Sequence, residues 1–512
     1  MHIRVLKDHL GDRVDISAPP LAKHVALVSA LFGVVLRGRQ YLANRSLWLD
    51  EALLALNIIN RSFTELTRPL TYDQGAPLGF LFAQKIMVQM LGNRDYILRL
   101  LPLIAGILAC FLMYKLAMRY AEGAGVPLAV GLFALSDQLI YYASEAKQYS
   151  SDVLFSSLLL LLICRCLEAD ARPRHFIDLG LAGALGMWMS HPALFVLAAG
   201  ALSLIVDVSV RRDRDRLAWV GEVLALWLLS LIPLFFSLRA LTSNTILTNY
   251  WRDSFMPMPP WRDIAWLQRA FSSMFRNPLG LSPVAIGAIF STIGCLSLLM
   301  KQWRLALPLV APLLITLLAS GIERYPFSGR LLLFTVPTML LLIAEGVERV
   351  HSLLHRVAPS VAFVALVIPI VLLLRDPFSA ALGNLHHPDM REHIKPVLSH
   401  VSQNKLKSDS IYIYYSALPA FAYYAPQYDL KDADYVVGIM SREQPSKYIE
   451  DMDQMMGQDR AWFLFSHNCS WCQVDEKAYF LRHLDSAGTR EDAFESEGAS
   501  TYLYDLRRAT TR

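Results

Sequence analysis

The chain has 512 residues, of which 54% are hydrophobic and only 18% are charged, and its formal net charge is +4. Soluble domains usually carry about 25% charged residues. This composition therefore indicates a membrane protein. The net charge is small and no basic stripe with interleaved aromatic residues occurs, which argues against a nucleic-acid partner.

The N-terminal part of the chain is polar and mixed in charge up to about residue 23. The apolar run that follows has no small-residue cleavage site of the kind found in secretory signal peptides. We therefore expect residues 1–23 to form a cytoplasmic N-terminus that precedes a retained first span.

About eleven apolar runs approach the roughly 20 residues that cross a bilayer. Short loops on one side of these runs are basic, such as the loops at Arg172–Arg174 and Arg211–Arg216. Because short cytoplasmic loops are enriched in Lys and Arg, this pattern places the N-terminus inside and, for an odd number of spans, the C-terminus outside. The predicted spans are residues 24–42, 96–118, 125–142, 152–168, 175–190, 192–209, 217–238, 281–300, 304–320, 331–348 and 360–374.

The predicted outer loop of residues 43–95 is long for a connector, and such loops are usually functional. It begins with Trp48-Leu49-Asp50-Glu51, where two carboxylates precede an apolar run with helical spacing. One interpretation is a helix cap, because carboxylates are stabilised at helix N-termini. The other is a general base for a hydroxyl nucleophile. Adjacent acids on a helix point in different directions, so only one of them would act as the base.

The tail, residues 375–512, has a different character and predicts a small soluble α/β domain. Its runs "IYIYYS" and "AWFLFS" are typical of strands of one sheet. Cys469 and Cys472 form a C-x-x-C pair, which fits a redox pair, half a metal site or a local disulfide, the last being favoured outside the cytoplasm. The stretch His386–His393, "HHPDMREH", matches no metal-binding spacing, and we interpret it as a solvated linker.

Several of these motifs together resemble the GT-C glycosyltransferases. The closest groups are the protein O-mannosyltransferases, the lipid A aminoarabinose transferases and bacterial family-39-like enzymes, and the resemblance covers roughly residues 22–375. It implies a GT-C transmembrane catalytic domain at residues 24–374 and a periplasmic α/β domain at residues 375–512. The motifs are "WLDE" from Trp48, "YDQGAPLGFLF" from Tyr72, "RLLPLIAGILA" from Arg99, "SEAKQYSSDVLFSSLLLL" from Ser144, "NYWRDSFMPMPP" from Asn249 and "RYPFSGRLLLFTVP" from Arg324.

The resemblance implies transfer of a sugar from a polyprenyl-phosphate carrier, with inversion, to a hydroxyl group on the outer side of a bacterial inner membrane. A glycolipid, a polysaccharide or a protein of the cell envelope could be the acceptor. Asp50 matches the catalytic acid of the family and takes the role of general base, and Glu51 matches a supporting acid. The aminoarabinose transferases carry Glu-Lys-Pro where this chain reads Asp73-Gln74-Gly75-Ala76-Pro77, so their lysine is missing here.

A phosphate leaving group requires positive charge nearby to stabilise it. Charged side chains in or next to spans are candidates for this role, although such side chains also snorkel to the interface. A divalent metal ion could share the role, with Asp73 and His191 as candidate ligands, although His191 also fits a helix end. The candidate phosphate contacts are Lys147, Arg252, Arg324 and Arg330, with Tyr325 as a hydrogen-bonding neighbour.

Two other classes of protein remain open. A lipid or sugar transporter would also be polytopic, but transporters usually show inverted repeats, and this chain shows no internal symmetry. A non-catalytic subunit that binds carrier lipid in a larger assembly is the second alternative. The chain has no Walker loop, dinucleotide fingerprint, G-x-S-x-G or H-E-x-x-H motif, which argues against nucleotide-driven pumping.

Overall fold

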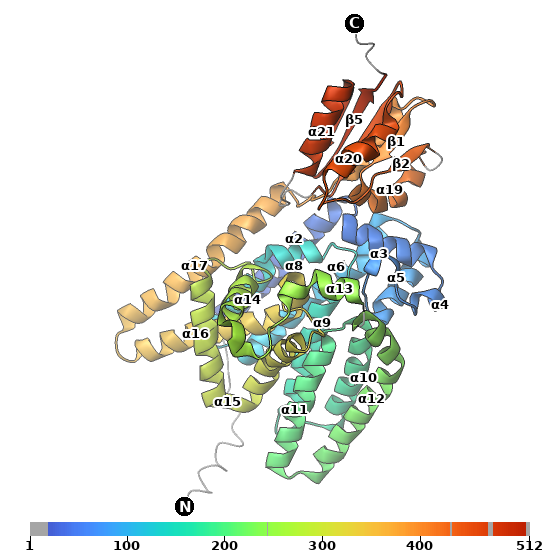
Figure 1. Ribbon diagram of the computed structural model, residues 1–512. Helices are drawn as coiled ribbons and strands as arrows, with labels where there is room; N and C mark the ends of the chain where they lie inside the picture. The colour runs from blue at the N-terminus through green and yellow to red at the C-terminus, as the bar shows by residue number, and fades with distance from the viewer. Residues whose placement is uncertain (1–18, 243, 431–432, 469–474, 508–512) are drawn as a thin grey trace, which may run out of the picture. The chain divides into compact units, whose positions relative to one another are not determined.

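The computed structural model describes residues 19–242, 244–430, 433–468 and 475–507 (Figure 1). The chain divides into two compact units. The first, which we call the helical unit, comprises Met1–Leu42, Ser62–Gly92 and Tyr96–Pro388. The second, the mixed unit, comprises Ala43–Arg61, Asn93–Asp95 and Asp389–Arg512. The segment that carries Asp50 and Glu51 thus belongs to the same compact unit as the C-terminal part of the chain.

The helical unit contains, in its described part, eight helices that are long and apolar enough to cross a membrane. This finding confirms the predicted polytopic α-helical architecture. The eight are α2 (Pro20–Leu42), α6 (Asp95–Tyr120), α9 (Tyr149–Leu167), α11 (Ala193–Arg211), α12 (Arg214–Thr242), α15 (Val284–Gly321), η4 with α16 (Gly329–Thr335 and Val336–His355) and α17 (Pro359–His386).

Shorter elements complete the helical unit. The Gly75-Ala76-Pro77 segment precedes α5 (Leu78–Leu91), a short apolar helix. The other short elements are α4 (Phe63–Leu66), η1 (Thr71–Asp73), α7 (Gly125–Leu135), α8 (Asp137–Tyr142), α10 (Pro173–Met189), α13 (Thr245–Tyr250), η2 (Arg252–Ser254), η3 (Pro260–Asp263) and α14 (Ile264–Arg276).

The difference between about eleven predicted spans and eight long helices has three local causes. The predicted span 125–142 is split into α7 and α8. The predicted span 175–190 is α10, which has only 17 residues. The predicted spans 281–300 and 304–320 are both part of α15, which is interrupted at Gln302, where φ is −148° and ψ is 62°.

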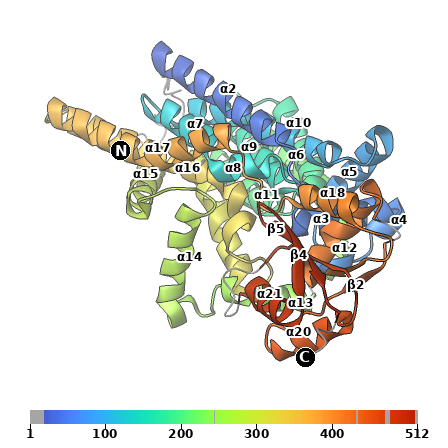
Figure 2. The ribbon, with the colours of Figure 1, turned by 90° about the horizontal axis from the view of Figure 1, so that it is seen from above.

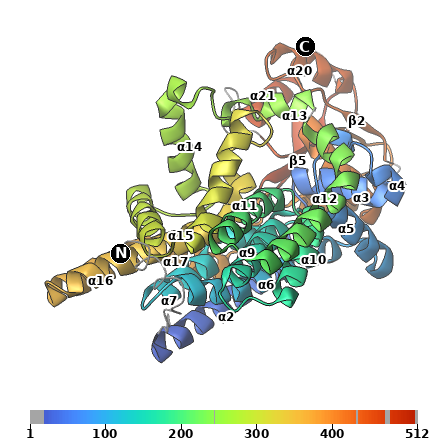
Figure 3. The ribbon, with the colours of Figure 1, turned by 90° about the horizontal axis from the view of Figure 1, so that it is seen from below.

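Helices of the helical unit pack in two groups that the figures show clearly. Helices α2, α7 and α17 lie side by side (Figure 2). Helices α9 to α12 form another packed group (Figure 3), in which α10 contacts both α9 and α12. Helices α15 and α16 cross closely at two glycines: a Cβ atom built on Gly346 would lie 1.9 Å from the carbonyl oxygen of Phe290. Such close crossings are typical of small residues in membrane helices.

The mixed unit is built around a five-stranded sheet with the order β2-β1-β3-β5-β4. The strands β1, β2 and β3 are parallel, whereas β5 is antiparallel to both β3 and β4. The predicted strands "IYIYYS" and "AWFLFS" correspond to neighbouring β1 and β3, which confirms a small α/β sheet. The strands are β1 (Ser410–Ile413), β2 (Tyr435–Val437), β3 (Ala461–Ser466), β4 (Thr489–Ser496) and β5 (Ala499–Asp505).

Burial explains which strands the sequence reveals. Every residue of β1 and β3 is buried, which fits their nearly continuous apolar runs. The edge strands β2 and β4 are largely exposed and give weaker patterns. The helices of the mixed unit are α3 (Leu49–Asn60), α18 (Ile394–Asn404), α19 (Leu418–Tyr424), α20 (Ser446–Met452) and α21 (Glu476–Ala487), with 3₁₀ turns η5 (Tyr415–Ala417), η6 (Ala425–Gln427) and η7 (Asp453–Met455).

One predicted boundary differs from the structure, and one predicted cysteine pair lies outside the described residues. Helix α17 continues to His386, past the predicted end of the last span at residue 374, and the mixed unit resumes at Asp389. Cys469 and Cys472 lie outside the described residues.

Candidate active site

Asp50 and Glu51 lie in the first turn of α3 but in different environments. Asp50 is half-buried, whereas Glu51 is fully buried. The Oε2 atom of Glu51 lies 2.7 Å from Nη1 of the buried Arg45 and accepts a hydrogen bond from the backbone N of Trp48 at 3.4 Å. The helix-cap interpretation therefore fits Glu51, which stabilises the start of α3. Asp50 precedes it in the same turn and points in another direction.

The segment before Asp50 is held by side chains from the C-terminal part of the mixed unit. The backbone N of Leu49 donates to Oε2 of Glu392 at 3.0 Å. The guanidinium of Arg391 lies over the ring of Trp48, 5.1 Å from its centroid. The interpretation of this part of "HHPDMREH" as a solvated linker is wrong, because Arg391 and Glu392 pack against the acidic motif instead of facing only solvent.

A second set of contacts in the mixed unit fixes the chain just before the motif. Nζ of Lys395 lies 2.8 Å from a carboxylate oxygen of Asp95 and donates to the carbonyl oxygen of Asn44 at 2.6 Å. The hydroxyl of Tyr424 donates to the same carboxylate at 2.8 Å and accepts from the backbone N of Leu47, also at 2.8 Å. Residues from both ends of the predicted outer loop therefore belong to one hydrogen-bond network.

In the helical unit, two of the four predicted phosphate contacts lie around the start of α9. Lys147 is buried just before this helix, and its Nζ donates to Oε1 of Gln74 at 2.5 Å. The guanidinium of Arg330, in η4, lies over the ring of Tyr149, 5.7 Å from its centroid. Tyr149 is the first residue of α9, and helix N-termini favour anions. Lys147 and Arg330 therefore flank an N-terminus suited to a phosphate group.

Tyr325 lies near this helix start, but its hydroxyl forms a hydrogen bond with the backbone of the same unit. It donates to the carbonyl oxygen of Leu331 at 2.8 Å, and its ring packs against Phe195 with centroids 4.9 Å apart. Burial raises the pKa of Tyr325 well above its ordinary value, and Asp152 and Tyr149 add to the effect. Tyr325 is therefore a neutral phenol that orders the η4 region.

The other two predicted phosphate contacts occupy exposed positions. Arg324 donates to the carbonyl oxygen of Thr242 at 3.2 Å. Arg252 lies in the short turn η2 and is also exposed. The described contacts thus group Lys147 with Arg330 and do not bring Arg252 or Arg324 into that group.

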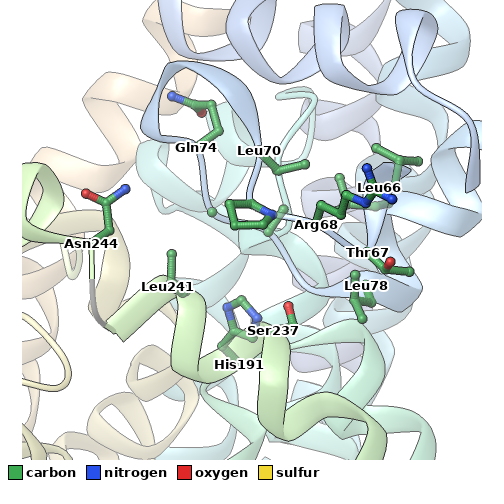
Figure 4. A pocket seen from close by; sticks show the side chains of 14 residues that line it. Leu66, Thr67, Arg68, Leu70, Gln74, Leu78, His191, Ser237, Leu241 and Asn244 are labelled. Atoms are coloured by element: carbon green, nitrogen blue, oxygen red, sulfur yellow. The ribbon is translucent and has the colours of Figure 1, made fainter. Parts of the chain in front are cut away.

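A pocket in the helical unit is lined by residues that include the partner of Lys147 (Figure 4). Its wall includes Gln74, the partner of Lys147, together with Arg68, His191 and Asn244. The remaining lining residues are Leu66, Thr67, Pro69, Leu70, Gly75, Ala76, Leu78, Leu81, Ser237 and Leu241.

Several polar residues near this pocket carry no motif in the sequence or only a weak one. Arg68 and Asn244 are loop residues, and Asn244 is explained locally because its side chain caps α13. Asp152 carried a stronger signal, since a carboxylate within an apolar span is a functional candidate by default. It is buried in α9 and hydrogen-bonded by the side chain of Ser190, next to His191.

The two predicted metal ligands have other surroundings. Asp73 accepts a hydrogen bond from Asn244 at 2.9 Å. Burial lowers the pKa of His191 to about 4, so its imidazole is neutral at pH 7. Within the described ranges, no group of three or more His, Cys, Asp or Glu side chains could hold a metal ion. A metal cofactor therefore stays a prediction.

The family of dolichyl-phosphate-mannose-protein mannosyltransferases matches residues 75–234. Comparison with curated proteins gives no match. Among solved structures, ArnT from Cupriavidus metallidurans bound to undecaprenyl phosphate is 12% identical with a TM-score of 0.50, over 94% of this chain and 98% of that one. The oligosaccharyltransferase AglB from Archaeoglobus fulgidus, in complex with an inhibitory peptide and a dolichol-phosphate, is 12% identical with a TM-score of 0.52, over 94% of this chain and 74% of AglB.

These similarities define the class of protein. The chain has the GT-C fold, which confirms the fold class and the resemblance that the motifs indicate. The apolar helices and these neighbours indicate a multi-pass membrane protein, and the matched family indicates a glycosyltransferase. Within that class, the chain resembles the mannosyltransferases and ArnT.

Proposed function

We propose that this protein transfers a sugar from a polyprenyl-phosphate-linked donor to a hydroxyl acceptor on the outer side of a bacterial inner membrane, with inversion. The observation that carries the proposal is the placement of Lys147 and Arg330 at the start of α9. The names of the matched family and of the ArnT and AglB structures support a polyprenyl-phosphate donor. The acceptor is a component of the cell envelope.

The cations act on the leaving group. When the bond between the anomeric carbon and the phosphate oxygen breaks, the phosphate gains negative charge. The planar guanidinium of Arg330 and the ammonium group of Lys147 stabilise that charge. The pocket beside Gln74 offers polar side chains, among them Arg68 and Asn244, to a sugar phosphate head group.

Asp50 acts on the acceptor. Its carboxylate takes the proton of the acceptor hydroxyl as the oxygen attacks the anomeric carbon, and the carrier leaves as polyprenyl phosphate. Glu51 supports this base from inside α3, because its pairing with Arg45 stabilises the first turn. In the described part of the chain Asp73 and His191 do not share a cluster of metal ligands, so no step is assigned to a metal ion.

Replacing Asp50 with Asn tests the proposal. The purified full-length protein is incubated with polyprenyl-phosphate mannose and polyprenyl-phosphate aminoarabinose, each with envelope acceptors, and the released polyprenyl phosphate is measured. Because removal of a general base typically costs 10²–10⁴-fold, we expect Asp50→Asn to lower kcat by about 100-fold or more.

The matched control is Asp459→Asn, which makes the same change at an exposed position of the mixed unit. We expect this variant to keep the turnover of the wild type. An Asp50→Asn variant that inserts normally and keeps full turnover would contradict the mechanism. A wild-type protein that binds the donors but releases no polyprenyl phosphate would favour the transporter or the non-catalytic subunit.

A further inference from the structure

We propose that Glu392 is a positioning residue that holds the start of α3, and with it the carboxylate of Asp50, in place for sugar transfer. This inference rests on the proposed function of Asp50 and deepens it. It assigns a role to a segment that the sequence alone predicts to be a solvated linker. Three sets of contacts within the mixed unit support it.

The carboxylate of Glu392 bridges the first amide of α3 and a histidine that directly follows β3. Its Oε2 accepts from the backbone N of Leu49 at 3.0 Å, and its Oε1 lies 2.6 Å from Nδ1 of His467. The first backbone N–H groups of a helix have no partner within the helix, and a negative charge there is stabilised by the helix dipole. Leu49 directly precedes Asp50, so a fixed Leu49 amide constrains the backbone that carries the base.

The residues on either side of Glu392 contact the same segment before Asp50. Arg391 covers the ring of Trp48. Nδ1 of His393 lies 3.2 Å from the backbone N and 3.1 Å from the hydroxyl of Ser46. Three consecutive residues, Arg391 to His393, therefore contact three residues in the run that ends just before Asp50. Because these contacts extend over the run Ser46 to Leu49, they fix the orientation of the whole segment and not only the Leu49 amide.

The backbone around Glu392 is itself constrained. Arg391 and His467 have φ values of 51° and 56°, in the left-handed region that disfavours residues other than glycine. Such conformations persist where the surrounding structure fixes them. The backbone N of His393 donates to the carbonyl oxygen of Glu497 at 2.7 Å, and a Cβ atom on Gly498 would lie 2.0 Å from the carbonyl oxygen of Arg391. The turn between β4 and β5 thus holds the backbone of Arg391 and His393 in place.

Hydrogen exchange of the full-length protein in detergent tests the positioning role without an activity measurement. Loss of the carboxylate in Glu392→Ala leaves the Leu49 amide without this acceptor. We expect exchange in peptides that cover Leu47–Leu53 to become about tenfold faster, as for the loss of one hydrogen bond to a charged group. Peptides from β3 should be unchanged. The control is Glu443→Ala, an exposed glutamate of the same unit.

Turnover of polyprenyl-phosphate mannose and polyprenyl-phosphate aminoarabinose tests the link to catalysis. We expect Glu392→Ala to lower kcat about tenfold and to leave KM for the donor unchanged, because only the placement of the base is altered. Glu392→Gln keeps one acceptor oxygen and should lose less. His467→Asn should lower kcat as well, and the double variant with Glu392→Ala should lose less than the product of the two single losses, because the residues act as one unit.

The outcomes separate this inference from the proposed function. Unchanged exchange at Leu47–Leu53 in Glu392→Ala overturns the positioning role, and so does an equal loss of kcat in Glu443→Ala. An effect on KM alone also overturns it. If Asp50→Asn keeps full turnover, the proposed function fails and the catalytic part of this inference fails with it, whatever the exchange shows.

Discussion

Asp50 and Glu51 illustrate how two identical charges next to each other acquire different roles. Burying a carboxylate is costly unless a partner of opposite charge compensates for it. Arg45 supplies that partner for Glu51, and the paired carboxylate stabilises the start of α3. Asp50 is half-buried and lies on another face of the helix. The sequence motif therefore combines a cap and a candidate base in adjacent positions.

The same reasoning separates the candidate cations. Lys147 is buried, and its ammonium group is held by a hydrogen bond to the side chain of Gln74. Arg330 is fixed against Tyr149. A preorganised cation stabilises developing charge without reorganising during the reaction. Exposed arginines such as Arg252 lack this advantage.

The low pKa of His191 predicts a dependence of stability on pH. Its pKa is about 4 in the folded protein, against an ordinary value of 6.5. Between these values the unfolded chain binds a proton that the folded chain does not, so stability falls as the pH decreases from 6.5 to 4. His191→Gln should remove this loss, which amounts to at most about 3.4 kcal/mol at 1.36 kcal/mol per pKa unit.

Thermal unfolding in detergent at about pH 4.5 and pH 7 measures this effect. The midpoint temperature of His191→Gln should change less between the two conditions than that of the wild type. His24→Gln, at an exposed histidine, is the control and should behave as the wild type does. Identical pH responses of His191→Gln and the wild type would refute the prediction.

At the scale of elements, the close crossing of α15 and α16 depends on glycines. A Cβ atom on Gly294 would lie 1.9 Å from the carbonyl oxygen of Leu342, and Gly346 faces the carbonyl oxygen of Phe290 in the same way. Membrane helices associate largely through close packing, since lipid provides no hydrophobic drive between them. The two glycines therefore set the distance between these helices.

Gly346→Ala should force α15 and α16 apart and destabilise the helical unit by about 1–3 kcal/mol, as overpacking usually does. The midpoint of thermal unfolding in detergent is the measurement. Gly221→Ala provides the control, because a Cβ atom at Gly221, in α12, would meet no atom within 4 Å. Equal midpoints for the two variants would show that the crossing tolerates a side chain.

At the scale of the whole molecule, the first outer loop is divided between the two units. Ala43–Arg61 and Asn93–Asp95 belong to the mixed unit, and Ser62–Gly92 belongs to the helical unit. The candidate base thus shares a unit with the C-terminal sheet, whereas the pocket and the two cations lie in the helical unit.

The proposed topology predicts where the C-terminus lies. With basic short loops inside and the N-terminus cytoplasmic, the mixed unit should face the periplasm. Alkaline phosphatase, which is active only outside the cytoplasm, should be active when fused after Arg512. A fusion at Arg212, in the loop between α11 and α12, is the control and should be inactive, since this loop is predicted to be cytoplasmic. The reverse pattern would invert the topology.

The sequence by itself determined the membrane class, the acidic motif and the buried strands β1 and β3. These features are local: apolar runs of the right length and strands buried on both faces leave a pattern in consecutive residues. The edge strands β2 and β4 left weak patterns because exposure relaxes the choice of residues. The break at Gln302 within α15 lies between the predicted spans 281–300 and 304–320, so the sequence also predicted this interruption.

Only the tertiary structure decided which polar residues work together. Glu392 is 343 positions from Leu49, and Gln74 is 73 positions from Lys147. No periodicity links residues at such separations, because their contacts follow from how helices and strands pack. The same holds for Glu51, whose burial against Arg45 could not be read from two adjacent acids. Local sequence specifies elements, whereas the environment that gives a charge its role arises when distant elements enclose it.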